Sequence, residues 1–146
     1  ENASVRFSPC CRPIPGDAIV GYLGRGEGLA VHVEDCPVAR KLRHKDAERF
    51  IGVEWSDEPV RAFETGIVVT VSNGKGVLAK VAAALAAAEA DIVHVDMGSE
   101  AQQNDAELRF VVAVRDSTHL QTALRNLSRT ASVLSAKRRK VASPSV

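Results

Sequence analysis

The sequence has few aromatic residues and few cysteines, and it contains no long apolar run. Aromatic residues make up 4% of the chain, which disfavours a platform on which the bases of single-stranded RNA would stack. The chain has three cysteines, and an odd number cannot all pair in disulfides within one chain. We therefore expect a reducing, cytoplasmic environment. No apolar run approaches the ~20 residues of a membrane-spanning helix, and no basic and apolar leader suggests export. We therefore expect no membrane partner.

The chain is short, and its first residue is Glu1 rather than methionine. Its 146 residues fit one or two small domains, and we expect the chain to be a piece of a longer protein. The formal net charge is only +1, so the distribution of charge is more informative than its sum. Each basic cluster fits either a solvated face or a patch that contacts phosphates. The clusters comprise Arg40, Lys41, Arg43, Lys45 and Arg49 after the last cysteine, and residues 137–140 near the end.

All three cysteines lie in the first quarter of the chain, and a histidine precedes the last of them by four positions. The residues are Cys10, Cys11, His32 and Cys36. Glycines and prolines between Cys11 and His32 indicate turns between short strands, so the chain can fold back and bring both ends together. Thiolate and imidazole donors suit tetrahedral zinc, and a set of four without a water position would be structural.

Other interpretations of these residues remain open. Cysteines are often buried packing residues or free thiols, and a lone histidine is often no ligand. Adjacent side chains on extended backbone also point to opposite faces. The pair Cys36 and Pro37 weakly resembles a haem-regulatory dipeptide. A redox pair of Cys10 and Cys11 would need a strained eight-membered ring and is disfavoured.

The first half predicts short strands and one helix. A strand at residues 4–7 precedes a hairpin formed by residues 19–23 and 29–33. The glycine-rich turn of this hairpin could cradle a phosphate, but such loops precede a helix and here a strand follows. Asp35 can cap a helix that ends near His44. A further strand is expected over residues 49–55.

A polar, acidic stretch that is closed by proline, residues 56–59, marks a domain boundary. Beyond it the expected elements are strands at 63–71, 91–97, 106–114 and 131–137 and helices from Val77 and from Asp116. We expect two buried stripes, Leu78, Val81, Leu85 and Ala88 in the first helix and Leu108, Phe110, Val112 and Val114 in the third strand. Val93, Val95 and Met97 are expected on one face of the second strand, and Leu120, Leu124 and Leu127 on one face of the second helix. This order is β-α-β-β-α-β, a ferredoxin-like α+β fold with both helices on one face of the sheet.

Two stretches resemble a known family. CCRPIPGDAIVG followed by HVEDCP resembles the zinc-binding, ribosome-intersubunit module of long RelA/SpoT homologues, which synthesise and hydrolyse (p)ppGpp in the bacterial stringent response. NGKGVLAKVAAAL and DIVHVDM resemble the ACT domain that ends the same proteins. The resemblance implies a zinc-stapled α/β module at 1–56, a linker at 57–62, a ferredoxin-like ACT domain at 63–140 and a disordered tail at 141–146.

The resemblance also assigns roles to residues. The family's metal set falls on Cys10, Cys11, His32 and Cys36, which implies zinc. The effector loop of ACT domains falls on Asn73, Gly74, Lys75 and Gly76, where Asn73 and Gly74 replace the usual Asp-Arg. Since similar domains in this family sense branched-chain amino acids, the resemblance implies valine or isoleucine as the ligand. Contacts to ribosomal RNA are expected from Arg12, Arg25, Arg40, Lys41, Arg43 and Lys45.

The chain itself shows no catalytic signature. His44, His94 and His119 lack partners at ligand spacing and are expected to be solvated or sheet residues. The first hypothesis is therefore a regulatory fragment that controls distant synthetase and hydrolase domains through ribosome docking or ligand sensing. The alternative is an amino-acid-sensing module that forms homodimers through the ACT domain and has no RNA role.

Overall fold

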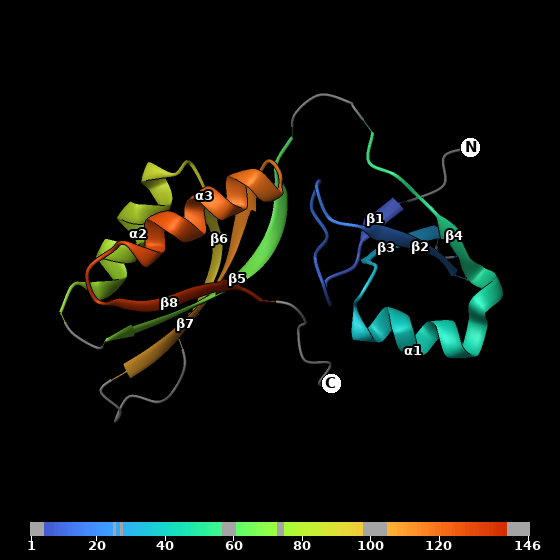
Figure 1. Cartoon of the computed structure of the whole chain (residues 1–146), viewed down its shortest axis with the longest axis horizontal. Helices are drawn as coiled ribbons and strands as arrows, with labels where there is room; N and C mark the ends of the chain where they lie inside the picture. The colour runs from blue at the N-terminus through green and yellow to red at the C-terminus, as the bar shows by residue number, and fades with distance from the viewer. Residues whose placement is uncertain are drawn as a thin grey trace. The chain divides into compact units, whose positions relative to one another are not determined.

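A computed structural model describes residues 5–24, 26, 28–56, 61–72, 75–97 and 105–139 (Figure 1). The described residues form two compact units, one before residue 57 and one from Arg61 to Arg139. Within the described ranges, no helix combines the length and the apolar character that crossing a membrane requires. The effector-loop residues Asn73 and Gly74, the expected RNA contact Arg25 and the expected tail at 141–146 lie outside the described residues.

The first unit is a small mixed sheet with one helix. Strands β1 (Val5–Phe7), β2 (Ile19–Gly24), β3 (Gly28–Val33) and β4 (Phe50–Gly52) lie in the order β1-β3-β2-β4. The predicted hairpin is confirmed, because β2 pairs antiparallel with β3 from Ile19–Val33 to Gly24–Gly28. Helix α1 (Pro37–Asp46) and the short 3₁₀ turn η1 (Ala47–Arg49) connect β3 to β4.

Two expectations for this unit need correction. The residue that caps α1 is Cys36 rather than Asp35, because Cys36 has extended backbone and its carbonyl accepts the first helical hydrogen bond, from Arg40 N. The strand expected over 49–55 covers only Phe50–Gly52. Beyond it, Trp55 stacks on Phe7 of β1 at 5.7 Å and donates its indole N–H to the Asp17 carbonyl at 3.0 Å.

The second unit has the predicted ferredoxin-like order. Its elements follow the order β5 (Phe63–Ser72), α2 (Val77–Ala87), β6 (Asp91–Met97), β7 (Asp105–Val114), α3 (Ser117–Ser128) and β8 (Val133–Arg138). The sheet is antiparallel in the order β6-β7-β5-β8. Both helices lie side by side on one face of this sheet (Figure 1). The predicted stripes of β7 and α3 are all buried there.

The apolar stripes predicted for α2 and β6 are wrong. In α2, Ala88 is only half-buried. Leu78 of α2 is 38% exposed, and Val77 is buried in its place beside Val81 and Leu85.

In β6 every residue is exposed, with Val93 at 48%, Val95 at 38% and Met97 at 56%. The register with β7 shifts between Ile92 and His94, which leaves Val93 without a partner. A bulge of this kind breaks the alternation. Ile92 and Val95 pair with buried residues of β7, but both are themselves 38% exposed, so no side chain of β6 belongs to the buried core.

Candidate metal centre

The turn after β1 directs two adjacent cysteines toward one point. The Ser8 carbonyl accepts hydrogen bonds from Cys11 N at 3.4 Å and Arg12 N at 2.8 Å, so the backbone curls instead of running extended. Arg12 has a φ of 44°, in the left-handed region that residues other than glycine rarely adopt. Adjacent side chains point to opposite faces only where the backbone is extended. The backbone curls here, so Cys10 and Cys11 can point toward the same site.

The other two residues of the cluster come from β3 and from the start of α1. His32 lies in β3 opposite Val20 of β2, and its side chain is 95% buried. Three residues beyond the end of β3, Cys36 precedes the first turn of α1, with its amide donating to the Val33 carbonyl at 3.0 Å. Three separate segments therefore supply the four side chains.

The distances between the donor atoms fit a tetrahedral metal ion. All four ligand atoms lie within 4.8 Å of one another. Cys10 Sγ is 3.7 Å from Cys36 Sγ, 3.9 Å from Cys11 Sγ and 3.5 Å from His32 Nδ1, and Cys11 Sγ is 3.8 Å from His32 Nδ1. A tetrahedron with Zn–S bonds of about 2.3 Å and a Zn–N bond of about 2.05 Å has S–S edges of about 3.8 Å and S–N edges of about 3.6 Å. Four of the six edges of the cluster therefore match those of a tetrahedral zinc site, and the other two are no longer than 4.8 Å.

The electrostatics of the cluster favour a cation at its centre. The hydrogen bond between the sulfurs of Cys10 and Cys11 lowers the pKa of Cys10 to about 4, and the nearby imidazole acts in the same direction. The same hydrogen bond, together with burial, raises the pKa of Cys11. Burial raises the pKa of Cys36, although the amides of Ala39 and Val38 oppose this. The three sulfurs thus share protons that a divalent cation would displace.

A buried serine orients the histidine. Ser8 Oγ lies 3.2 Å from His32 Nε2, and Ser8 is only 6% exposed. This contact leaves Nδ1 directed at the sulfurs, which is the arrangement by which a second partner of a ligating histidine fixes its ring. The Val33 amide donates to Cys11 Sγ at 3.2 Å and supports that sulfur. The role of Ser8 was not predicted from the sequence, because serine is not one of the residue types of a zinc ligand motif.

The comparisons with known proteins match both units. The RelA/SpoT RIS domain family model matches residues 1–56, and the ACT domain family model matches residues 59–138. The chain belongs to the RelA/SpoT family. The predicted order, a RIS domain and then an ACT domain, is confirmed.

Similar proteins include enzymes of (p)ppGpp metabolism. The bifunctional (p)ppGpp synthase/hydrolase SpoT of Escherichia coli is 33% identical over 87% of this chain and 18% of its own length. GTP pyrophosphokinase of E. coli is 28% identical over 94% of this chain and 18% of its own length. The solved ACT domain of GTP pyrophosphokinase from Chlorobium tepidum is 14% identical, covers 54% of this chain and 100% of that chain, and has a TM-score of 0.47. The chain thus spans about a fifth of the length of the curated relatives it matches.

These matches show that the chain consists of a RIS domain and an ACT domain and is homologous to the C-terminal regulatory region of SpoT and RelA. The two matched domains are regulatory domains, and the relatives are named as synthases, hydrolases and pyrophosphokinases. The Cys10, Cys11, His32 and Cys36 cluster of the RIS unit could hold a metal ion.

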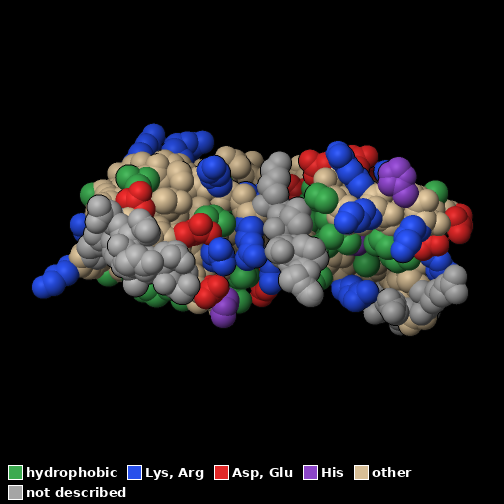
Figure 2. Space-filling model, turned by 90° about the horizontal axis from the view of Figure 1, so that it is seen from below, with side chains coloured by type: hydrophobic (Ala, Val, Ile, Leu, Met, Phe, Trp, Pro, Cys, Tyr) green, Lys and Arg blue, Asp and Glu red, His purple; other side chains and the backbone are tan. Residues whose placement is uncertain are grey.

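Four of the six expected RNA-contacting residues lie together on α1 of the RIS unit. Arg40, Lys41, Arg43 and Lys45 are all exposed on this ten-residue helix. Figure 2, which views the molecule from the side on which α1 lies, shows Lys and Arg side chains gathered on this unit. The Arg43 guanidinium also lies 5.2 Å from the centre of the Phe50 ring, which holds it in place. Arg12 is half-buried in the turn beside the cysteines and lies apart from α1 in sequence.

The expected effector loop of the ACT unit is described only in its second half. Lys75 and Gly76 form a turn before α2, and both are exposed. Gly76 has a φ of 72° and begins the helix without a side-chain cap. This conformation explains the glycine, because a Cβ would strain the left-handed backbone. The described half therefore accounts for a tight turn.

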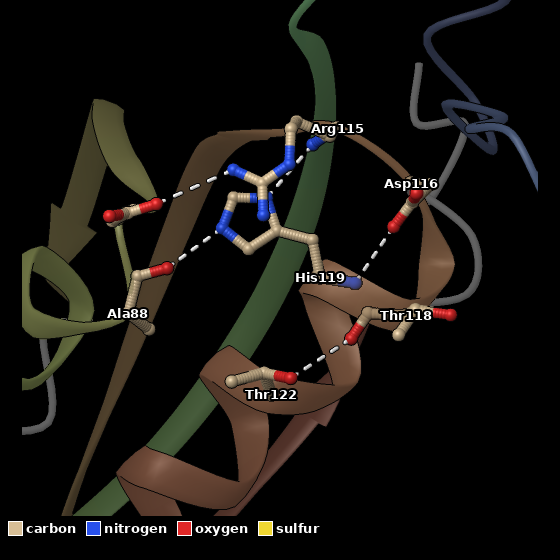
Figure 3. A network of polar contacts seen from close by, with 7 residues as sticks. Ala88, Arg115, Asp116, Thr118, His119 and Thr122 are labelled. Carbon is tan, nitrogen blue, oxygen red and sulfur yellow. Dashed lines mark hydrogen bonds and ion pairs between the residues drawn. The ribbon is translucent and has the colours of Figure 1, made fainter. Parts of the chain in front are cut away.

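Of the three remaining histidines, one departs from expectation. His44 and His94 are exposed, but His119 is 94% buried on α3 (Figure 3). Its Nδ1 accepts from Arg115 N at 3.0 Å, so its Nε2 carries the proton and donates to the Ala88 carbonyl at 2.8 Å. His119 thereby ties the start of α3 to the end of α2. The adjacent surface cavity, about 360 Å³, is lined by groups of this same network.

Proposed function

We propose that the RIS unit binds one zinc ion through Cys10, Cys11, His32 and Cys36, and that this ion holds helix α1 so that its basic side chains contact ribosomal RNA. In the parent enzyme, docking to the ribosome would control the distant synthetase and hydrolase domains. The observation that carries the proposal is the convergence of four buried or half-buried soft donors at the residue that begins the basic helix.

Zinc is the metal that this donor set favours. Three sulfurs and one imidazole make a Cys₃His set, and four of the six edges of the cluster match tetrahedral zinc. Four protein ligands leave no position for water, so the ion would be structural rather than catalytic. Because Cys36 is both a ligand and the first cap residue of α1, the ion would fix the position and direction of this helix.

The basic side chains of α1 would contact phosphates rather than bases. Their charge is concentrated on one short helix, and the scarcity of aromatic residues offers few stacking surfaces. Lysine and arginine that neutralise phosphates release counterions, so binding weakens as salt rises. For four contacts the logarithmic slope is about −3, which predicts a roughly 50- to 150-fold loss of affinity between 50 and 200 mM salt.

The test compares two triple variants with the same change of charge. Arg40→Ala, Lys41→Ala and Lys45→Ala together should weaken binding of the chain to ribosomes and flatten the salt dependence by about two units or more. The control removes three exposed basic residues of the ACT unit, Lys80, Arg125 and Arg129, and should leave both unchanged. Equal losses in the two variants, or affinity that does not change with salt, would contradict the docking proposal.

Amino-acid sensing is the second candidate, and the ACT match favours it because ACT domains suggest ligand binding. The N-terminus of α2 offers backbone N–H groups with no side-chain cap, and such groups can meet a carboxylate. The proposed ligand is valine or isoleucine, held at a homodimer seam beside Asn73, Gly74, Lys75 and Gly76. Calorimetry with the twenty amino acids tests this: saturable binding of a branched-chain amino acid supports sensing, and no heat with any of them contradicts it.

A further inference from the structure

The three sulfurs of the cluster differ in their access to solvent. Cys11 is 4% and Cys36 is 2% exposed, whereas Cys10 is half-buried. All three are free cysteines. A small oxidant that approaches from solvent therefore meets Cys10 Sγ first, and the thiolate that a bound zinc ion would maintain at this position is the nucleophilic form.

Only one partner of Cys10 is well placed for a disulfide. Cys36 Sγ lies 3.7 Å away, so rotation of the two side chains can bring the sulfurs to the ~2.05 Å of an S–S bond. Cys11 Sγ is at a similar distance of 3.9 Å, but a bond between neighbours would close the strained eight-membered ring. Cys11 Sγ also accepts the Val33 amide, which holds it against β3.

We propose that Cys10 and Cys36 form a reversible oxidation site, at which a peroxide converts the pair to a disulfide and expels the metal ion. The proposal rests on the zinc site proposed above for the metal release, and on the sulfur positions alone for the disulfide. Its product links the turn after β1 directly to the first residue before α1, so the cross-link replaces the ion between these two segments.

The chemistry balances with one peroxide for each pair. Cys10 Sγ attacks the O–O bond, becomes a sulfenic acid and releases one water. Cys36 Sγ then attacks that sulfur, and the second water leaves as the S–S bond forms. The two sulfurs lose two electrons, which the peroxide gains, and for metal-bound thiolates the two protons come from solvent. Cys11 and His32 alone then remain as ligands, too few for a structural zinc site. A dithiol reductant reverses the step.

The experiment uses the whole chain, purified without chelator and treated with one equivalent of hydrogen peroxide. Zinc content is measured first, and zinc release and free thiols are followed during the reaction. Trypsin does not cleave between Arg12 and Pro13, so Cys10 and Cys11 stay in peptide 7–25 and Cys36 falls in peptide 26–40. Digestion of the monomeric, non-reduced band then shows which sulfurs are joined, and fragment ions separate Cys10 from Cys11.

The expected result is a fall from three thiols to one, a cross-link of the two peptides through Cys10, release of one equivalent of zinc, and reversal by dithiothreitol. A disulfide inside peptide 7–25, a cross-link through Cys11, a sulfinic acid on Cys10 without a cross-link, or three unchanged thiols would each overturn the proposal. Zinc that is bound at the start but not released refutes the proposal and leaves the zinc site standing. Absence of zinc at the start, with the cross-link still formed, refutes the zinc site and leaves the oxidation site standing.

A variant tests whether Cys10 is one of the two joined sulfurs. Cys10→Ser should abolish the cross-link between the peptides, and persistence of the cross-link at the rate of the unaltered chain would contradict the role of Cys10. The wild-type digest carries the same information through its fragment ions, so the test holds even where the variant does not fold.

Discussion

Removal of the metal is expected to unfold the RIS unit and to leave the ACT unit folded. Among described Val, Leu, Ile and Phe side chains, the RIS unit buries three, which are Ile14, Val20 and Val31, whereas the ACT unit buries thirteen. Each such side chain contributes about 1.5–3 kcal/mol when it is fully buried. The RIS unit thus lacks most of the apolar burial that stabilises its neighbour, and two more of its buried residues, Cys11 and Cys36, are themselves proposed ligands.

The size of the effect follows from comparing the metal with the core. A core of a module below ~70 residues rarely supplies more than about 3–5 kcal/mol, whereas structural zinc binding in finger peptides is worth about 10–16 kcal/mol at pH 7. The free energy that is lost with the ion is therefore larger than the stability that the apolar core alone can supply. Cys36→Ser and His32→Ala should each have the same consequence, since each removes one ligand of four.

Differential scanning calorimetry of the whole chain measures this directly. The metal-bound chain should show two transitions, and chelation or either variant should remove the RIS transition while the ACT transition keeps its midpoint. His44→Ala, which removes an exposed histidine of α1, serves as the matched control and should keep both transitions. Protein purified without added metal that contains none, or a RIS transition that survives chelation, would refute the reasoning.

Three further changes test the surroundings of the cluster and the packing of the ACT unit. Ser8→Ala removes the contact to His32 Nε2 and should weaken zinc binding about 10- to 100-fold in a competition titration without unfolding the metal-saturated chain; unchanged affinity would contradict the orienting role. His119→Ala leaves the Arg115 amide and the Ala88 carbonyl without their partner and should cost the ACT unit about 2 kcal/mol, or about 10 °C in Tm, whereas His94→Ala should cost almost nothing. Gly21→Ala places a Cβ 2.8 Å from Leu29 Cδ1. It should destabilise the RIS unit by the ~1–3 kcal/mol of an overpacked site and so lower its midpoint, and an unchanged midpoint would contradict this close packing.

The pattern of apolar residues predicted the order of the ACT elements and the buried faces of β7 and α3. The buried residues of β7 and α3 follow the periods of a strand and a helix. The prediction failed where the backbone departs from the regular period. At Val93 a bulge shifts the register, and no residue type in that stretch signals it. Leu78 was misplaced because nearly every position of α2 is apolar, so the sequence does not mark the buried side.

The first unit was harder to predict from the sequence, because side chains distant in sequence decide its structure. The ligand set was identified from residue types and family resemblance, but spacing argued against two adjacent ligands. Only the turn at Ser8 and the left-handed backbone of Arg12 show how Cys10 and Cys11 converge. Beyond β4, Trp55 donates its indole N–H to the Asp17 carbonyl, a contact between residues 38 positions apart that the local sequence does not indicate. His119 was assigned to solvent because the bonds that bury it involve backbone atoms of Arg115 and Ala88.

The two units therefore differ in what holds them together, and this difference bears on regulation. The ACT unit is stabilised by a continuous apolar core that no single side chain dominates. The stability of the RIS unit is concentrated in one cluster of four side chains, and Cys36 at that cluster also begins the basic helix α1. A change in that cluster alone, whether loss of the ion or joining of two sulfurs, would alter the support of α1 while the ACT unit stays folded. A signal that acts on the cluster would therefore reach the proposed ribosome contact without passing through the proposed ligand site of the ACT unit.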